Sequence, residues 1–261
     1  MEEMIKIYGY VEKGLGKVEC QDRVLIGDTM LAGGFLEASW EDMKNMVVAV
    51  ADGVGGYPGG EIASLMAVDG IRMLNRRMSL DTEGITELAK NVNRGILQYG
   101  RQNPMLERMA TTLTALVMNG DKAISIHIGN CRLCTFRKYL QQITKDQTVV
   151  EDMISRGEIS REQAKSSEIR NQINACLGGN KEEYIQELRV TEEGFATKDS
   201  NIILTSDGIH DYMDEEELEE KLISETEPKK LCEEIARRAR ENGSEDDISI
   251  VIIDRMGKYD R

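Results

Sequence analysis

Histidine, proline and clustered basic residues are all scarce in this sequence of 261 residues. With two histidines and no His-Glu-x-x-His segment, the sequence argues against a zinc enzyme. Three prolines and no Ser/Gly-rich stretch give no sign of a linker, so we expect a single domain over residues 1–261. The net charge is -14 and no segment gathers lysine and arginine, which argues against a nucleic-acid partner because such binding needs a basic surface.

Long apolar runs are also missing. No segment approaches the length of a membrane span, and Glu2 and Glu3 stand where a secretory signal would be basic. We therefore expect a cytoplasmic monomer that has no membrane partner. The five cysteines are an odd and scattered set, which is typical of reduced thiols in that compartment.

Short β-rich runs are frequent along the chain. Residues 46–51 form an almost continuous apolar run, which is typical of a strand covered on both faces. The other predicted strands cover residues 5–11, 23–26, 29–31, 113–118, 123–128, 132–136, 140–143, 187–190, 202–205 and 248–253.

Helical signals lie between these runs. Thr148 with Glu151 and Ser160 with Gln163 fit the capping-box pattern of a helix start. Asp146 is expected to cap the helix that begins near Thr148. Apolar spacing and a proline in a first turn predict further helices over residues 60–78, 82–100 and 228–240. Strands, a helix pair and strands again favour an α+β fold, an antiparallel sandwich with helices outside.

Four aspartates stand at the ends of predicted strands. Asp52 and Asp207 each follow an apolar strand and precede glycine, whereas Asp22 and Asp246 stand just before strands. Because antiparallel neighbours place one strand's exit beside the other's entry, these four carboxylates can gather at one rim. There they would repel each other unless a cation neutralised them, and oxygen ligands favour Mg²⁺ or Mn²⁺. An ordinary turn is the alternative for each Asp-Gly pair.

Motifs along most of the chain follow the order of one protein family. Residues 52–56 (DGVGG) and 59–61 (GGE) resemble the first Asp-Gly motif of the PPM (type 2C) metal-dependent serine/threonine phosphatases in their bacterial form. The other matching segments are ATTL at 110–113, HIGNCR at 127–132, LQQITKD at 140–146, RGEI at 156–159, NQINACLG at 171–178, TSDGI at 205–209 and DDIS at 246–249.

The resemblance implies a fold and an activity. The expected fold is a four-layer αββα sandwich, two central antiparallel sheets flanked by helices, with a helical flap at about 147–180. The expected activity is hydrolysis of phosphoserine and phosphothreonine in proteins by water that two Mn²⁺ or Mg²⁺ ions activate. The implied partners are phosphoprotein substrates and a Ser/Thr kinase that the enzyme would oppose.

The resemblance also implies a role for each matching residue. Asp52 would bridge both metals, and the Gly53 carbonyl would coordinate one of them. Asp22 would help to hold one ion, partly through waters. Asp207 and Asp246 would hold the other ion, and all four aspartates count as catalytic on this reading.

Several residues depart from the family pattern, among them Gln21, where many relatives have an acidic residue, and Val54, where animal relatives have a histidine. Lys17 stands where the family usually has a phosphate-gripping arginine, so we expect it to bind phosphate as a point charge and more weakly. Asn130 replaces an aspartate that binds a third metal, which predicts a weak or empty third site. Asp247 stands where the family usually has asparagine, so Asp246 is the expected ligand of the two.

Two alternatives remain open from sequence. The first is a family member with little or no activity that acts as a signalling or binding module. The changes at Lys17 and Asn130 would then reflect a loss of catalysis. The second is a phosphatase of small phosphoesters. No Cys-x5-Arg loop is present, which argues against a thiol phosphatase.

Overall fold

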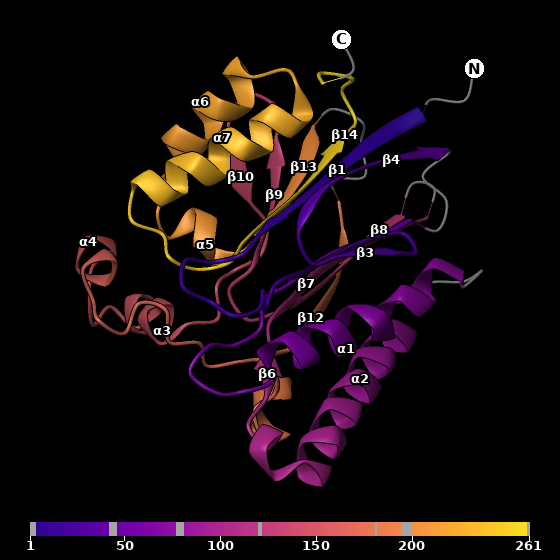
Figure 1. Cartoon of the computed structure of the whole chain (residues 1–261), viewed down its shortest axis with the longest axis vertical. Helices are drawn as coiled ribbons and strands as arrows, with labels where there is room; N and C mark the ends of the chain where they lie inside the picture. Colours follow the sequence, from indigo (N-terminus) through magenta and orange to yellow (C-terminus); the bar gives the residue numbers. More distant parts are fainter. Residues whose placement is uncertain are drawn as a thin grey trace.

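The structure is a computed structural model, and it describes residues 4–41, 46–76, 81–119, 122–180, 182–194 and 200–259. Figure 1 shows two β-sheets that lie face to face, with helices on the outer side of each. Within the described ranges, no helix combines the length and the apolar character needed to cross a bilayer.

The described residues form two large antiparallel sheets. The first has the order β10-β9-β13-β14-β1-β4. Its strands are β1 (Met4–Glu12), β4 (Gly34–Glu41), β9 (Arg132–Phe136), β10 (Leu140–Gln142), β13 (Asn201–Thr205) and β14 (Ile248–Asp254).

The second large sheet has the order β12-β8-β7-β5-β2-β3. Its strands are β2 (Arg23–Ile26), β3 (Thr29–Leu31), β5 (Met46–Ala51), β7 (Leu113–Asn119), β8 (Lys122–Ile128) and β12 (Arg189–Glu193). A short pair, β6 (Ala110–Thr111) and β11 (Leu177–Gly178), lies beside it.

Helices cover the outer faces of both sheets. Figure 1 shows α1 and α2 on one side and α6 and α7 on the other. The helices are α1 (Gly60–Arg72), α2 (Thr82–Gln102), α3 (Val149–Ser155), α4 (Arg161–Lys165), α5 (Asp207–His210), α6 (Glu215–Ser224) and α7 (Pro228–Glu241), with 3-10 turns at Met73–Arg76, Pro104–Leu106 and Glu182–Glu187.

Three apolar layers of side chains hold the two sheets and the two outer groups of helices together. Val48 and Val50 on β5 point into the layer between the two sheets, whereas Val47 and Ala49 on the same strand pack under α1 and α2. A third layer joins the first sheet to α5, α6 and α7, with Ile235 fully buried in it. The apolar run at 46–51 is therefore a strand covered on both faces, as predicted.

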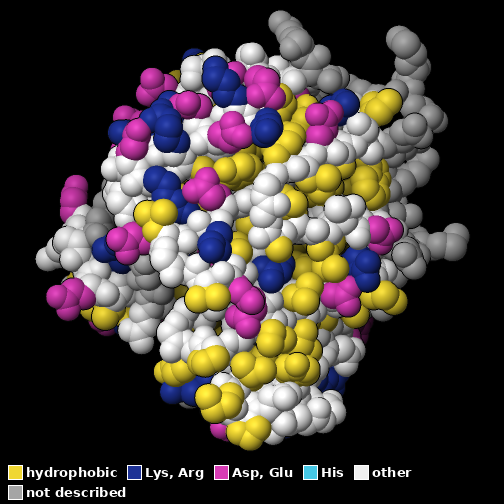
Figure 2. Space-filling view, in the orientation of Figure 1, with side chains coloured by type: hydrophobic (Ala, Val, Ile, Leu, Met, Phe, Trp, Pro, Cys, Tyr) yellow, Lys and Arg dark blue, Asp and Glu magenta, His cyan; other side chains and the backbone are white. Residues whose placement is uncertain are grey.

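The surface agrees with the charge pattern of the sequence. Figure 2 shows acidic and basic side chains interspersed over α6 and α7, and the described residues on this face form no continuous basic patch.

The capping predictions are confirmed at two positions and wrong at one. The Thr148 side chain accepts a hydrogen bond from the Glu151 backbone N–H, and Ser160 forms a complete capping box. Asp146 caps no helix; it accepts three hydrogen bonds from the Arg132 guanidinium, at 2.6 to 3.1 Å. An ion pair between a strand residue and a loop residue 14 positions further on has no local sequence pattern, which is why spacing alone misassigned Asp146.

Other boundaries differ modestly from prediction. The helix predicted over 60–78 ends as an α-helix at Arg72 and continues as a 3-10 turn to Arg76, while residues 77 and 78 lie outside the described residues. The strand predicted at 187–190 begins at Arg189. The edge strand β4 was not predicted, although residues 36–41 (LEASWE) alternate apolar and polar side chains as a half-buried strand does, and Leu36, Ala38 and Trp40 pack against the layer between the sheets.

The layer between the sheets generates a stability prediction. Leu116→Ala removes a fully buried side chain from this layer. We expect the free energy of unfolding to fall by about 2–5 kcal/mol, because lost burial and the remaining cavity both destabilise. Urea denaturation measures the change. Met105→Ala, at a side chain that is 81% exposed, is the control and should shift by less than about 0.5 kcal/mol; equal effects of the two substitutions would contradict the assignment.

Candidate metal centre

Strand pairing brings the first two predicted ligands together. In the second sheet, β2 and β5 run antiparallel with Arg23 opposite Ala51. Asp22 immediately precedes β2 and Asp52 immediately follows β5, so both side chains lie at the same end of this sheet.

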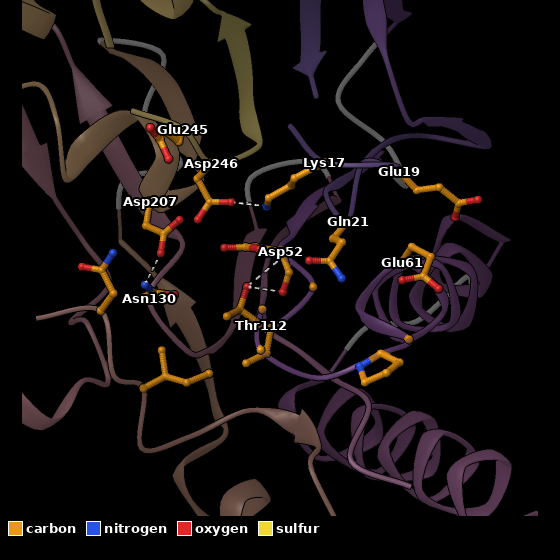
Figure 3. Close-up of a pocket in the computed structure, with 18 of the residues that line it drawn as sticks. Lys17, Glu19, Gln21, Asp52, Glu61, Thr112, Asn130, Asp207, Glu245 and Asp246 are labelled. Carbon is orange, nitrogen blue, oxygen red and sulfur yellow. Dashed lines mark hydrogen bonds and ion pairs between the residues drawn. The ribbon is translucent and has the colours of Figure 1, made fainter. Parts of the chain in front are cut away.

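The first sheet repeats this arrangement. Strands β13 and β14 run antiparallel with Thr205 opposite Ile250. Asp207 follows β13 and Asp246 precedes β14, so they too share one end. The sequence argument placed strand exits beside strand entries without assigning pairs, and Figure 3 shows Asp52, Asp207 and Asp246 directed toward the same pocket.

The pocket has a volume of about 1040 Å³. Its lining includes Lys17, Gln21, Asp52, Gly53, Thr112, Asn130, Asp207 and Asp246. Asp22 does not line it, because its side chain is fully buried behind the pocket wall. The structure therefore places three of the four aspartates at the surface of the cavity and the fourth beneath it.

Two threonine hydroxyls fix the backbone of Asp52. The Thr111 hydroxyl donates to the Asp52 carbonyl at 2.9 Å, and the Asp52 backbone N–H donates to the Thr112 hydroxyl at 3.1 Å. A Cβ atom added to Gly53 would lie 2.5 Å from the Gly60 backbone, so only glycine fits between these segments. The Asp-Gly and Ala-Thr-Thr motifs thus have a structural reason for their residue types.

Two buried carboxylate oxygens lack a hydrogen-bond partner. Asp22 accepts from the Ser249 hydroxyl through Oδ2, and Asp207 accepts from the Asn130 amide through Oδ2 at 2.9 Å. The Oδ1 atoms of both aspartates are buried with no partner among the described residues. A buried acceptor without a partner destabilises a fold, so these oxygens fit a bound cation.

The pKa shifts of these aspartates also indicate that the site needs a cation. Burial raises the pKa of Asp22 to about 7, and the negative charge of Asp247 adds to this effect. Burial, followed by the charges of Asp207 and Asp22, raises the pKa of Asp52 well above its usual value. The pKa of Asp207 is also raised, first by burial and then by the charge of Asp246. A divalent cation would remove this repulsion.

The donor set suits a hydrated hard ion. In the described part of the chain, no three His, Cys, Asp or Glu side chains lie close enough together to form a group that could hold a metal ion. Mg²⁺ usually keeps several waters and binds one or two carboxylates, so separated oxygen donors are compatible with it. A structural zinc site would need a closed set of four ligands.

Asp246 and Asp247 have different environments. The Asp247 side chain is fully buried and accepts from the backbone N–H groups of Gly14 and Gln21 at 2.7 and 2.8 Å and from Lys17 at 3.0 Å. The Asp246 side chain is 37% exposed and lines the pocket. This difference favours the predicted choice of Asp246 as a ligand, because Asp247 is already fully engaged.

Lys17 lines the pocket but is not free. Its ammonium group pairs with both Asp246 and Asp247. Burial lowers the pKa of Lys17, but the hydrogen bonds and charges of the two aspartates outweigh burial and raise the pKa above its usual value. Lys17 would have to give up part of this pairing to contact a phosphate, which is consistent with the weaker phosphate binding expected from sequence.

One positioning residue escaped the sequence reasoning. The Arg240 guanidinium donates to the backbone carbonyls of Ser244 and Asp246 at 3.0 and 2.6 Å, and also to Glu12 and the Lys13 carbonyl at 3.0 and 3.2 Å. It therefore ties the loop of Asp246 to the segment that leads to Lys17. Nothing in the local sequence distinguishes Arg240 from other arginines of α7.

Comparison with known proteins defines the family. The protein phosphatase 2C family model matches residues 20–249. Since this match spans most of the chain, the protein belongs to the protein phosphatase 2C family, as predicted.

Two bacterial phosphatases are among the proteins similar to this chain. The serine/threonine phosphatase stp of Listeria monocytogenes is 29% identical over 219 residues, covering 80% of this chain and 84% of that protein. The serine/threonine protein phosphatase PstP of Mycobacterium tuberculosis is 31% identical over 215 residues, covering 80% of this chain and 40% of that protein.

Solved structures share the fold. The crystal structure of M. tuberculosis PstP/Ppp has a TM-score of 0.80 at 26% identity and covers 96% of this chain and 98% of that one. The PstP catalytic domain in complex with 2 manganese ions has a TM-score of 0.74 at 25% identity, with 97% and 99% covered. These matches confirm the four-layer α+β sandwich.

The contrast between the adjacent aspartates generates a prediction. Asp247→Asn replaces one acceptor oxygen by an amide donor that faces other donors, so we expect the unfolding free energy of the metal-free protein to fall by about 1–3 kcal/mol. Asp246→Asn removes half of a partly exposed ion pair and should cost less than about 1 kcal/mol. Urea denaturation in a chelator compares the two, and a larger loss for Asp246→Asn would refute the assignment of Asp247 as the structural partner.

Proposed function

We propose that this protein is a metal-dependent phosphoprotein phosphatase that hydrolyses phosphoserine and phosphothreonine with two Mn²⁺ or Mg²⁺ ions. The observation that carries the proposal is the set of buried carboxylates with unpartnered oxygens at the shared end of the two sheets. When bound, the ions supply an activated water and positive charge for the phosphoryl oxygens.

The residues that would hold the ions follow from this arrangement. Asp52 would bridge the two ions, and the Gly53 carbonyl would coordinate one of them. Asp22 would contribute from beneath the pocket, partly through waters, because its free Oδ1 is buried. Asp207 and Asp246 would hold the second ion from the other sheet.

The remaining polar residues adjust the site. Lys17 would offset the charge of Asp246 and contribute one positive charge toward the phosphate. Asn130 would hold Asp207 in place through its 2.9 Å hydrogen bond and would leave a third metal position weak or empty. The neutral amide of Asn130 provides an oxygen but no negative charge, so its attraction for a third cation is weak.

The segment at 147–180 is proposed as a flap of one catalytic domain over residues 1–261. It contains α3 and α4, and its residues Asn171 and Ile173 reach the lining of the pocket. Because these two residues lie at the pocket, the segment is suited to contact with a substrate.

We also propose a cytoplasmic monomer that acts on phosphoproteins and opposes a Ser/Thr kinase. All five cysteines are free and buried, which suits a reducing compartment. The names of the relatives, serine/threonine phosphatases, support phosphoprotein substrates. A signalling module without catalysis has no observation in its favour, since the four aspartates are intact.

Loss of the bridging ligand tests the proposal. We expect Mn²⁺-dependent hydrolysis of a phosphothreonine peptide, and Asp52→Asn should lower kcat/KM by at least about a hundredfold because charge stabilisation is lost. Mn²⁺ should stabilise the wild type by about 2.7 kcal/mol at 100 times its Kd, but not this variant. Asp69→Asn, on the exposed side of α1, is the matched control and should behave as wild type; metal-independent hydrolysis would refute the proposal.

Restoring a carboxylate tests the third metal position. Asn130→Asp exchanges the amide that donates to Asp207 for a second negative charge, so an additional cation is needed to offset the repulsion. We expect the Mn²⁺ stoichiometry measured by native mass spectrometry to rise from two ions per chain to three. A wild-type protein that already binds three ions with similar affinity would show that Asn130 does not weaken the site.

A further inference from the structure

Three glutamates surround the pocket without belonging to the proposed ligand set. Glu19, Glu61 and Glu245 all line it. In Figure 3, Glu245 lies beside Asp246 on one side of Asp52, and Glu19 and Glu61 lie on the other side. Glu19 and Glu245 are exposed and Glu61 is half-buried. No ion pair is recorded for any of the three within the described residues.

Few cations lie near these glutamates: outside the lining, Lys13 donates to the Val18 carbonyl at 3.4 Å and Arg170 lies 5.9 Å from the Tyr212 ring. Lys17 is the single lysine or arginine among the described residues that line the pocket, and both Asp246 and Asp247 already pair with it. Two divalent ions would balance the buried aspartates and attract the phosphate, but they would not contact the outer carboxylates. The rim of the pocket, which Glu19, Glu61 and Glu245 form, therefore stays negative when two divalent ions occupy the centre.

The rim also offers contact surface for an extended substrate. Leu15 and Val18 line the same pocket and are 62% and 92% exposed. The pocket volume of about 1040 Å³ is slightly above the range of small-molecule sites, which is about 300–1000 Å³. A peptide can place its phosphorylated side chain at the centre and its flanking residues on both sides of the rim.

We propose that this phosphatase selects phosphorylated sites that are flanked by lysine or arginine and disfavours sites in acidic sequences. This inference rests on the proposed function, and it names the substrate class of the same pocket. Flanking cations would meet Glu19 and Glu61 on one side and Glu245 on the other. Flanking carboxylates, or the extra phosphates of a small metabolite, would face repulsion there.

The test compares two phosphothreonine peptides of equal length. One carries arginine on both sides of the phosphothreonine, and the other carries glutamate at the same positions. With the full-length Mn²⁺-loaded protein at low salt, we expect kcat/KM for the arginine peptide to exceed that for the glutamate peptide by at least about tenfold. The ratio should shrink toward one at about 1 M salt, where the Debye length is about 3 Å.

Variants locate the effect at the rim. Glu19→Gln and Glu245→Gln should each lower the ratio by up to about fivefold, the usual limit for an exposed ion pair. Glu220→Gln makes the same charge change at an exposed position of α6 outside the pocket, and it should leave the ratio unchanged.

Each outcome decides a different point. Equal hydrolysis of the two peptides would overturn the proposed selectivity and leave the phosphatase function standing. An equal effect of Glu220→Gln would assign the preference to net charge and overturn the role of the rim. Hydrolysis of neither peptide would refute the proposed function, and the selectivity with it.

Discussion

Repulsion among buried carboxylates is the constraint on which this site depends. Asp22, Asp52 and Asp207 come from three different strand ends, and burial raises the pKa of each. The two sheets hold these side chains in place through the apolar layer between them, so the charges cannot move apart. A divalent cation at this position would replace repulsion by attraction, so metal binding would stabilise the arrangement of these carboxylates.

The chain neutralises this charge only in part. Ser249 and Asn130 each satisfy one carboxylate oxygen, and Lys17 supplies one positive charge to Asp246. The pairing of Lys17 with Asp247 joins two departures from the family pattern in one contact. Because Lys17 pairs with the fully buried Asp247, its positive charge mainly offsets the charges of Asp246 and Asp247. Only the remaining part of that charge is available to attract a phosphate.

Much of the fold was predictable because its signals are local. The continuous apolar run of β5 predicted a strand covered on both faces, and the Ser160 capping box predicted a helix start. The edge strand β4 was missed although its residues alternate, and the Arg132–Asp146 ion pair was missed because a contact between segments far apart in sequence leaves no short pattern. The pairing of aspartates within each sheet followed from the antiparallel arrangement, but their meeting across two sheets depended on packing that spacing cannot show. Arg240 had no signal for the same reason.

Anomalous diffraction from crystals soaked in Mn²⁺ is the sharpest test of this metal centre, because it locates each ion. Two peaks are expected in the pocket, both within ligand distance of Asp52, one on the side of Asp22 and one on the side of Asp207. Peaks elsewhere on the protein, or none in the pocket, would refute the proposed metal centre.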